Sequence, residues 1–207
     1  MSSRSAAAAL AGAAVLAAGC GGGDHEGKPT TPTIFKVTVP NGTPVAGVAT
    51  AFSVAPGRAI TVAHAVDGRR TVLVAAPGQK ARRVRVLRTD RRLDLAVLAV
   101  PDVRVPVFGS ERLESGMYGF VQVLRGTERI TLHAQLLRQI TASVRNAPGA
   151  VAQVRPALEL RTVVAQGDSG APVLDLNGRV IGMLFAQAGD REDRAYALDA
   201  SAFGGGD

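Results

Sequence analysis

The chain has 207 residues, of which 46% are hydrophobic and only 4% aromatic, and its formal net charge is +7. This length fits one compact domain or two small lobes, and a core of small branched side chains suits many short strands. The single cysteine, Cys20, excludes an intramolecular disulfide. The positive charge indicates solubility and a loose attraction to anionic surfaces, and it predicts no particular fold.

The first residues read as an export signal. Arg4 precedes an apolar run, residues 6–18, that is shorter than the roughly twenty residues a transmembrane helix needs. The ending Leu16-Ala17-Ala18-Gly19-Cys20 resembles a bacterial lipoprotein signal, in which a lipid is attached to the cysteine, although Ala17 replaces the usual leucine. We therefore expect a lipoprotein-type signal peptide over 1–19, a lipid on Cys20 and a flexible tether over 20–32. The alternative is an ordinary cleaved signal with an incidental free cysteine, and both predict export.

From Thr33 onward, short apolar runs alternate with turn residues. The spacing of about ten residues predicts an all-β sandwich or barrels, in two groups of about six strands divided near 105–115. Only residues 130–140 have a pattern that also allows a helix. Residues 201–207 are expected to be a disordered tail. The expected strands are 34–39, 45–54, 58–62, 71–75, 81–87, 95–100, 118–124, 130–144, 151–154, 157–164, 171–174, 180–185 and 195–198.

The stretch Gln166-Gly167-Asp168-Ser169-Gly170-Ala171-Pro172 lies between two apolar runs and predicts a tight turn on a β scaffold. Glycine at 167 allows positive φ, so that the N–H groups of Gly167 and Ser169 could converge on an oxyanion beside an exposed serine hydroxyl. The plainer interpretation is a polar hairpin without chemistry.

A nucleophilic serine needs a base, and the chain has three histidines. His25 falls in the tether, and His133 is interpreted as structural because no partner motif accompanies it. His64 ends an apolar strand, where the scaffold would hold the imidazole rigidly. Asp94 directly precedes another apolar run, where a buried carboxylate needs a hydrogen-bond partner such as an imidazole N–H. Asp90 and Asp102 are expected to be solvated.

The order His64, Asp94, Ser169 is that of chymotrypsin-type proteases, and the contexts Thr61-Val62-Ala63-His64, Asp94-Leu95-Ala96-Val97-Leu98 and Gly167-Asp168-Ser169-Gly170 agree with it. Over residues 34–200 the chain resembles bacterial trypsin-like serine proteases of the HtrA/Deg-like group, and most of all the actinobacterial acid-resistance periplasmic proteases (MarP-like). Ala171 departs from the family, which mostly has a second glycine there, and Ala49-Thr50-Ala51-Phe52 replaces a glycine-rich strand start.

The resemblance implies two six-stranded antiparallel β-barrels, over about 33–104 and 112–200, with the site in the cleft between them. It implies a Ser-His-Asp acyl-enzyme mechanism on a polypeptide substrate, with no cofactor or metal. It also places Val163, six residues before the serine, at the base of the primary specificity pocket, with Phe185 and Ala186 in one wall. An apolar base predicts small or medium apolar residues before the cleaved bond.

Basic residues crowd the stretch from Arg69 to Arg92. Outward positions of a strand explain this pattern, and docking on anionic lipid headgroups is the functional alternative. The stretch lacks the interleaved aromatic side chains of a nucleic-acid platform, so no nucleic acid is expected as a partner.

These observations predict an exported cell-envelope lipoprotein, on the outer face of a membrane or in the periplasm, that acts as a serine endopeptidase in protein quality control or processing. A catalytically silent binding module on a protease fold, and an anchored adhesion or structural lipoprotein, are the alternatives. The oligomeric state is left open.

Overall fold

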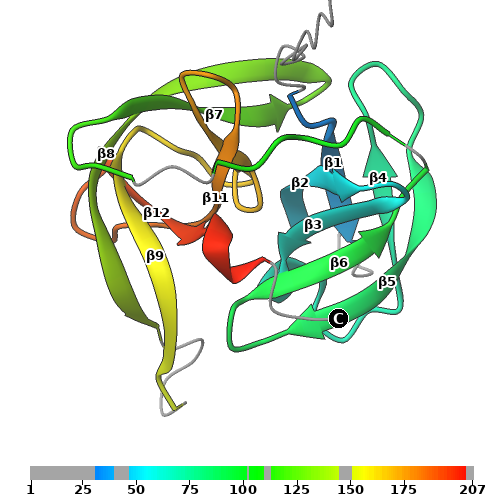
Figure 1. Cartoon of the computed structure of the whole chain (residues 1–207). Helices are drawn as coiled ribbons and strands as arrows, with labels where there is room; N and C mark the ends of the chain where they lie inside the picture. Colours follow the sequence, from blue (N-terminus) through cyan, green and yellow to red (C-terminus); the bar gives the residue numbers. More distant parts are fainter. Residues whose placement is uncertain (1–30, 40–46, 102, 110–112, 145–150, 204–207) are drawn as a thin grey trace, which may run out of the picture.

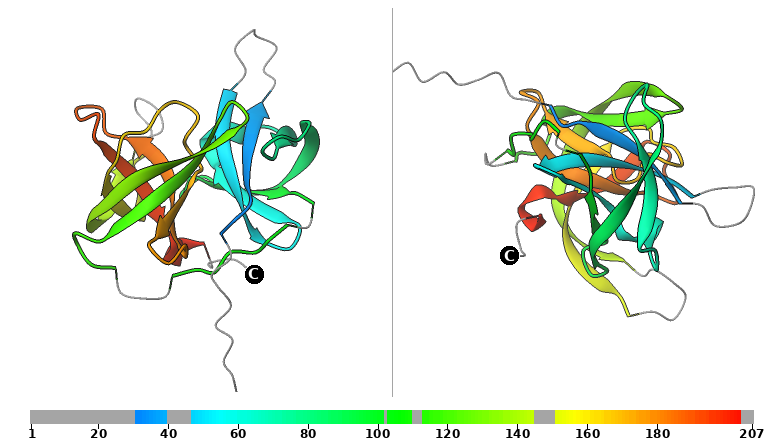
Figure 2. Two further views of the ribbon diagram at one scale, coloured as in Figure 1. Left: turned by 90° about the horizontal axis from the view of Figure 1, so that it is seen from above. Right: turned by 90° about the vertical axis from the view of Figure 1, so that its right-hand side faces the viewer.

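The computed structural model describes residues 31–39, 47–101, 103–109, 113–144 and 151–203. Its strands form two closed barrels of six antiparallel strands each, side by side (Figures 1 and 2), which confirms the predicted fold class. The signal peptide, Cys20 and His25 lie outside the described residues, as does Asp102. Within the described part of the chain, no helix is long and apolar enough to cross a membrane.

The first barrel closes in the order β1-β2-β3-β6-β5-β4. Glycine at tight turns makes its short hairpins possible; Gly57, at φ 69°, joins β2 to β3. A single helical turn, α1 (Ala63–Val66), follows β3 directly. The strands are β1 (Ile34–Val39), β2 (Gly47–Ala55), β3 (Arg58–Val62), β4 (Thr71–Ala75), β5 (Arg82–Asp90) and β6 (Leu95–Ala99).

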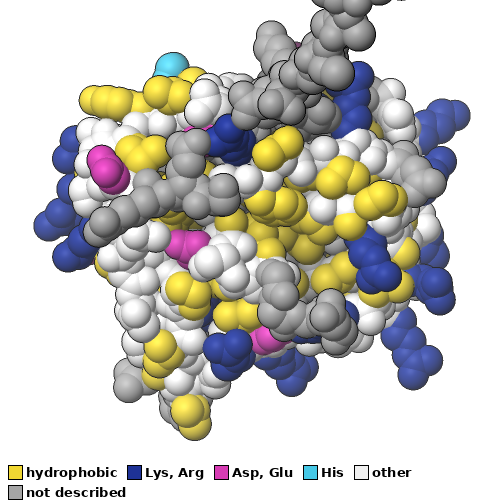
Figure 3. Space-filling model, in the orientation of Figure 1, with side chains coloured by type: hydrophobic (Ala, Val, Ile, Leu, Met, Phe, Trp, Pro, Cys, Tyr) yellow, Lys and Arg dark blue, Asp and Glu magenta, His cyan; other side chains and the backbone are white. Residues whose placement is uncertain are grey.

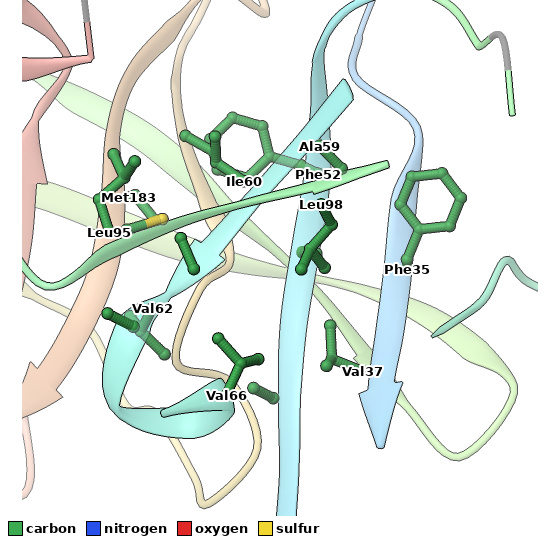
Figure 4. Packing of buried hydrophobic residues seen from close by; sticks show 14 of the residues in the cluster. Phe35, Val37, Phe52, Ala59, Ile60, Val62, Val66, Leu95, Leu98 and Met183 are labelled. Carbon is green, nitrogen blue, oxygen red and sulfur yellow. The ribbon is translucent and has the colours of Figure 1, made fainter. Parts of the chain in front are cut away.

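The core of the first barrel consists mostly of small and branched side chains, with the Phe35 and Phe52 rings among them. Phe52 is fully buried, with Ile60, Val62 and Leu98 packed in the same cluster (Figure 4). Each such side chain stabilises the fold by about 1.5–3 kcal/mol when it leaves water. Met183 from β11 (Val180–Gln187) of the second barrel also belongs to this cluster. The two barrels therefore share buried apolar contacts, which hold them in a fixed arrangement.

The second barrel closes in the order β10-β11-β12-β9-β8-β7. Residues 130–140 are strand, because β8 is one long strand with a register shift between Leu136 and Arg138, and its side chains alternate between the core and solvent. The strands are β7 (Tyr118–Arg125), β8 (Glu128–Val144), β9 (Gln153–Arg161), β10 (Pro172–Asp175), β11 (Val180–Gln187) and β12 (Arg194–Asp199).

Strand β9 differs from expectation, because the two runs predicted over 151–154 and 157–164 form a single strand that contains Pro156. A proline has no N–H to donate, so it is tolerated in a strand only where one side has no neighbour. Pro156 pairs with Thr141 of β8, whereas β12 pairs with β9 only from Ala157 onward. Pro156 therefore lies just beyond the last residue pair between β12 and β9, Leu198 with Ala157, and β9 continues through the proline.

The C-terminal residues that the structure describes belong to the fold, in contrast to the tail expected over 201–207. Residues Ala200–Ala202 form a 3-10 turn, η1, in which the Asp199 carboxylate accepts a hydrogen bond from the Ser201 N–H at 2.9 Å. The Phe203 ring then packs against Phe52 and Phe108, with centroids 6.2 and 6.1 Å away. Aromatic burial holds residues 201–203 in place, and 204–207 lie outside the described residues.

Candidate active site

His64 lies on α1, directly after the buried strand β3, so that the rigid first barrel fixes its backbone. The backbone N–H of His64 donates to Asp94 Oδ1 at 2.8 Å, and the ring Nδ1 of His64 is 2.7 Å from Asp94 Oδ2. An ionised carboxylate can only accept, so in the neutral imidazole Nδ1 is the protonated nitrogen and Nε2 the one with a lone pair. The ring is half exposed.

Asp94 is held in an unusual backbone conformation directly before β6. Its φ of 58° makes it the only non-glycine residue with positive φ in the described part of the chain. Such a conformation costs about 1–3 kcal/mol and persists only where surrounding contacts impose it. Those contacts are the two hydrogen bonds to His64, a third from the Ala63 N–H to the Asp94 carbonyl at 3.0 Å, and burial of the carboxylate.

The segment from Ala165 to Ala171 forms the turn expected around Ser169. Gly167 and Gly170 have φ of 98° and 89°. The Gly170 N–H donates to the Leu184 carbonyl at 2.7 Å, and the Ala171 N–H donates to the Asp168 carbonyl at 3.0 Å. The N–H groups of Gly167 and Ser169, in contrast, donate to no other described residue. Both remain available to a ligand, as an oxyanion hole requires.

Thr50 of the first barrel holds this turn of the second barrel. Its N–H donates to the Ser169 carbonyl at 2.8 Å, and its hydroxyl donates to the Gly167 carbonyl at 3.0 Å. The Thr61 hydroxyl in turn donates to the Thr50 carbonyl at 2.7 Å, three residues before His64. These contacts bring the serine turn and the histidine to the same junction between the barrels. Sequence reasoning missed both threonines; the one signal was their position inside apolar strands, where a hydroxyl needs a partner.

Asp168 organises the turn from inside. Its side chain is only 2% exposed; it accepts the Ala165 N–H at 2.8 Å and binds Arg125 Nη2 at 2.6 Å. This hydrogen bond, with the negative charge of Asp168, raises the pKa of Arg125 above its ordinary value despite partial burial. Arg125 ends β7, and nothing in its sequence context marks it as part of the site.

The serine hydroxyl and the histidine base are not hydrogen-bonded to each other in this structure. Among the described residues, neither Oγ of Ser169 nor Nε2 of His64 has a hydrogen-bond partner. Catalytic hydrogen bonds are often long in free enzymes and tighten when substrate binds.

The residues predicted for the specificity pocket separate into two groups. Phe185 and Ala186 line a cavity of about 510 Å³ with Tyr196 and the end of β8, residues 140–144, and Val163 is not in this lining. Val163 is 65% exposed, between the buried Thr162 and Val164. This exposure is high for the floor of a pocket, and the assignment of Val163 to that floor stays a prediction.

The other candidate groups make no hydrogen bond to His64, Asp94 or Ser169 among the described residues. His133 is exposed on β8, with its ring 5.7 Å from that of Phe120. Asp90 accepts the Leu93 N–H at 2.9 Å and so closes the turn that leads to Asp94. In the ranges that the structure describes, no three His, Cys, Asp or Glu side chains gather as metal ligands would.

Two barrels with a hydrogen-bonded His–Asp pair and a glycine-flanked serine turn at their junction define the trypsin-like class of peptidases. Comparison with known families agrees: the trypsin-like peptidase domain matches residues 49–183, and the chain belongs to this family. Among curated proteins, it is 35% identical over 160 residues to the serine protease Rv3671c of Mycobacterium tuberculosis strain H37Rv. The match covers 75% of this chain but only 40% of that protein.

Solved structures also show the similarity to serine proteases of this family. The chain resembles the crystal structure of the Rv3671c protease from M. tuberculosis in its active form, with a TM-score of 0.73 and 31% identity, over 83% of this chain and 78% of that one. The inactive form matches with a TM-score of 0.71 and 32% identity, over 83% and 85%. The HtrA-type protease AlgW, at 18% identity and a TM-score of 0.67 over 84% and 58%, shares the fold.

Proposed function

We propose that this chain is a serine endopeptidase in which Ser169 is the nucleophile, His64 the general base and Asp94 the group that orients the base. The observation that carries this proposal is the double hydrogen bond between Asp94 and His64, which fixes the imidazole with its proton on Nδ1. The serine turn is held against the same part of the first barrel by Thr50.

In the proposed reaction, the Ser169 oxygen attacks the carbonyl carbon of the peptide bond while Nε2 of His64 takes the hydroxyl proton. The N–H groups of Gly167 and Ser169 stabilise the oxyanion, which is worth about 3–4 kcal/mol per donor in related sites. His64 then gives its proton to the leaving amine, and an acyl-enzyme remains. Water, activated by His64, releases the second product and restores the serine.

The substrate is proposed to be a polypeptide with a small or medium apolar residue before the cleaved bond. Phe185 and Ala186 support this proposal because they give the cavity an apolar wall. Val163 supports it by its apolar side chain alone, because it is 65% exposed and lies outside that lining. A peptide library incubated with the full chain would test both claims, with Ser169→Ala as the inactive variant and Ser201→Ala as the matched control. Cleavage mainly after Arg or Lys would refute the pocket assignment.

The cellular role is proposed to be envelope protein quality control or processing by an exported, lipid-anchored enzyme. The support is the signal-like sequence that ends at Cys20. Expression of the full chain with and without Cys20→Ser in an actinobacterial host tests it: the parent should fractionate with membranes and the variant in the soluble fraction. Equal distribution of the two would refute the lipid anchor while leaving the peptidase proposal intact.

A catalytically silent binding module is the second candidate. It is favoured by one observation, the absence of a hydrogen bond between the Ser169 hydroxyl and His64 within the described structure. A folded chain that binds peptides from the library but cleaves none would support this second function.

A further inference from the structure

Among the described residues, Arg155 is the largest fully buried side chain, and it lies beside the His64–Asp94 pair. It comes from β9 in the second barrel, whereas His64 and Asp94 belong to the first. Its side chain is 0% exposed, and Nη1 lies 3.5 Å from Asp94 Oδ2, the same oxygen that binds the His64 ring. Its Nη1 also donates to the carbonyl oxygen of Leu93 at 3.1 Å.

A guanidinium in this position needs an explanation, because removing a charge from water costs several kcal/mol. Structural arginines usually offset that cost with several hydrogen bonds, since the group has five N–H donors. Arg155 does not: Nε and Nη2 have no partner in the described structure. Its compensation comes from the Asp94 carboxylate, the Leu93 carbonyl and the Phe185 ring, whose centroid is 5.0 Å from Cζ.

These contacts act on the part of the site that is under strain. Leu93 and Asp94 form the turn in which Asp94 has its positive φ, and Arg155 contacts both residues from outside the first barrel. We propose that Arg155 is a positioning residue, which holds the Leu93–Asp94 turn from the second barrel and so fixes the carboxylate that orients His64. This proposal rests on the proposed peptidase function.

The position of Arg155 gives the two barrels a direct polar connection at the catalytic pair. The Phe185 ring that packs on the guanidinium belongs to β11, and it also lines the cavity that Ala186 and Tyr196 share. The arginine thus joins the acid of the first barrel to a strand of the second. A small displacement of either barrel would move Asp94, and displacement of a catalytic group by about 1 Å can lower a rate about a hundredfold.

The test is a double-mutant cycle in the full chain, with Arg155→Met, Asp94→Asn and the double variant. Arg155→Met should lower kcat for a peptide substrate by about ten- to a hundredfold, with KM changed little, and Arg155→Lys should restore part of it. In the Asp94→Asn background the same change should have an effect within about twofold, because the group through which Arg155 acts is already lost. An equal loss in both backgrounds would overturn the proposal, and so would unchanged kcat in a folded Arg155→Met variant.

The matched control is Arg138→Met, the same substitution on the neighbouring strand β8 at an exposed arginine that pairs with Glu159. It should leave kcat unchanged. Should Arg155→Met fail to fold, Arg155→Lys carries the same comparison, because it keeps the charge and loses the planar fork.

A second readout separates this proposal from the peptidase proposal. The ring ¹⁵N resonances of His64, assigned with His64→Ala, report the Nδ1–Asp94 hydrogen bond whether or not the protein cleaves peptides. Arg155→Met should shift them and Arg138→Met should not. Identical His64 resonances in the parent and in Arg155→Met would overturn the positioning role, whereas an inactive parent with the expected shift would refute only the peptidase proposal.

Discussion

At the scale of single residues, the serine turn depends on positions where only glycine fits. An added Cβ at Gly170 would lie 1.9 Å from the Thr50 carbonyl oxygen and 2.6 Å from the Thr61 hydroxyl. This crowding is a consequence of the close approach between the turn and the first barrel, which also produces the Thr50 hydrogen bonds. Ala171, in contrast, carries its methyl group into the core of the second barrel, where it is fully buried.

Substitution of Gly170 by alanine should therefore lower the free energy of unfolding by more than the strain of a positive φ alone would. Gly78 is the matched control, because it also has positive φ, 68°, but nothing lies within 4 Å of the added Cβ. We expect Gly78→Ala to lower the free energy of unfolding by about 1 kcal/mol, and Gly170→Ala to lower it by about 3 kcal/mol or more, with loss of activity. Urea unfolding measures both; equal losses would contradict this account of the turn.

At the scale of elements, the strands follow from alternation and turn residues, and the sequence predicts β1, β3 and β4 with the bounds that the structure has. The sequence does not predict how β9 passes Pro156, because that depends on where β12 ends. The sequence also does not predict α1 and η1, because both are too short to show a helical periodicity of apolar residues. The pairing of His64 with Asp94 is predictable from a histidine after one buried strand and an acid before another, whereas Arg155 and Thr50 act through contacts distant in sequence.

The turn η1 and Phe203 should contribute to the stability of the first barrel. Phe203→Ala removes two aromatic contacts, with Phe52 and Phe108, and each such pair is worth about 0.5–1.5 kcal/mol beyond the buried area. We expect the free energy of unfolding to fall by about 1–3 kcal/mol. Tyr118→Ala, at a ring that is 63% exposed, should change it little. Urea unfolding measures both variants. If Phe203→Ala and Tyr118→Ala had the same midpoint of urea unfolding, residues 201–203 would not be part of the folded domain.

At the scale of the whole molecule, the site exists only where the barrels meet. Figure 3 shows basic side chains along the outer edges of the molecule and apolar side chains over its middle. Several of the basic residues between Arg69 and Arg92 are exposed, and Arg91 pairs with Asp67 at 2.7 Å. The barrels, by contrast, meet through buried contacts, of which the polar ones involve Thr50 and Arg155.

The Thr50 contact predicts a functional effect without loss of the fold. Thr50→Val keeps the shape of a fully buried side chain but leaves the Gly167 carbonyl without its donor, which costs about 1–3 kcal/mol. The proposed oxyanion hole at Gly167 and Ser169 should become less well ordered, so that turnover falls more than the free energy of unfolding does. Thr71→Val is the control, because the Thr71 hydroxyl only accepts an exposed hydrogen bond from Arg83. A Thr50→Val variant with full turnover would show that the first barrel does not position the serine turn.

The most direct test of the central claim is covalent labelling of the full chain with a fluorophosphonate, followed by mass spectrometry of the modified peptide. The probe reacts only with a serine whose base and oxyanion hole are assembled. We expect a single adduct on Ser169, absent in Ser169→Ala and strongly reduced in His64→Ala. An adduct on another serine, or labelling that persists in Ser169→Ala, would contradict it.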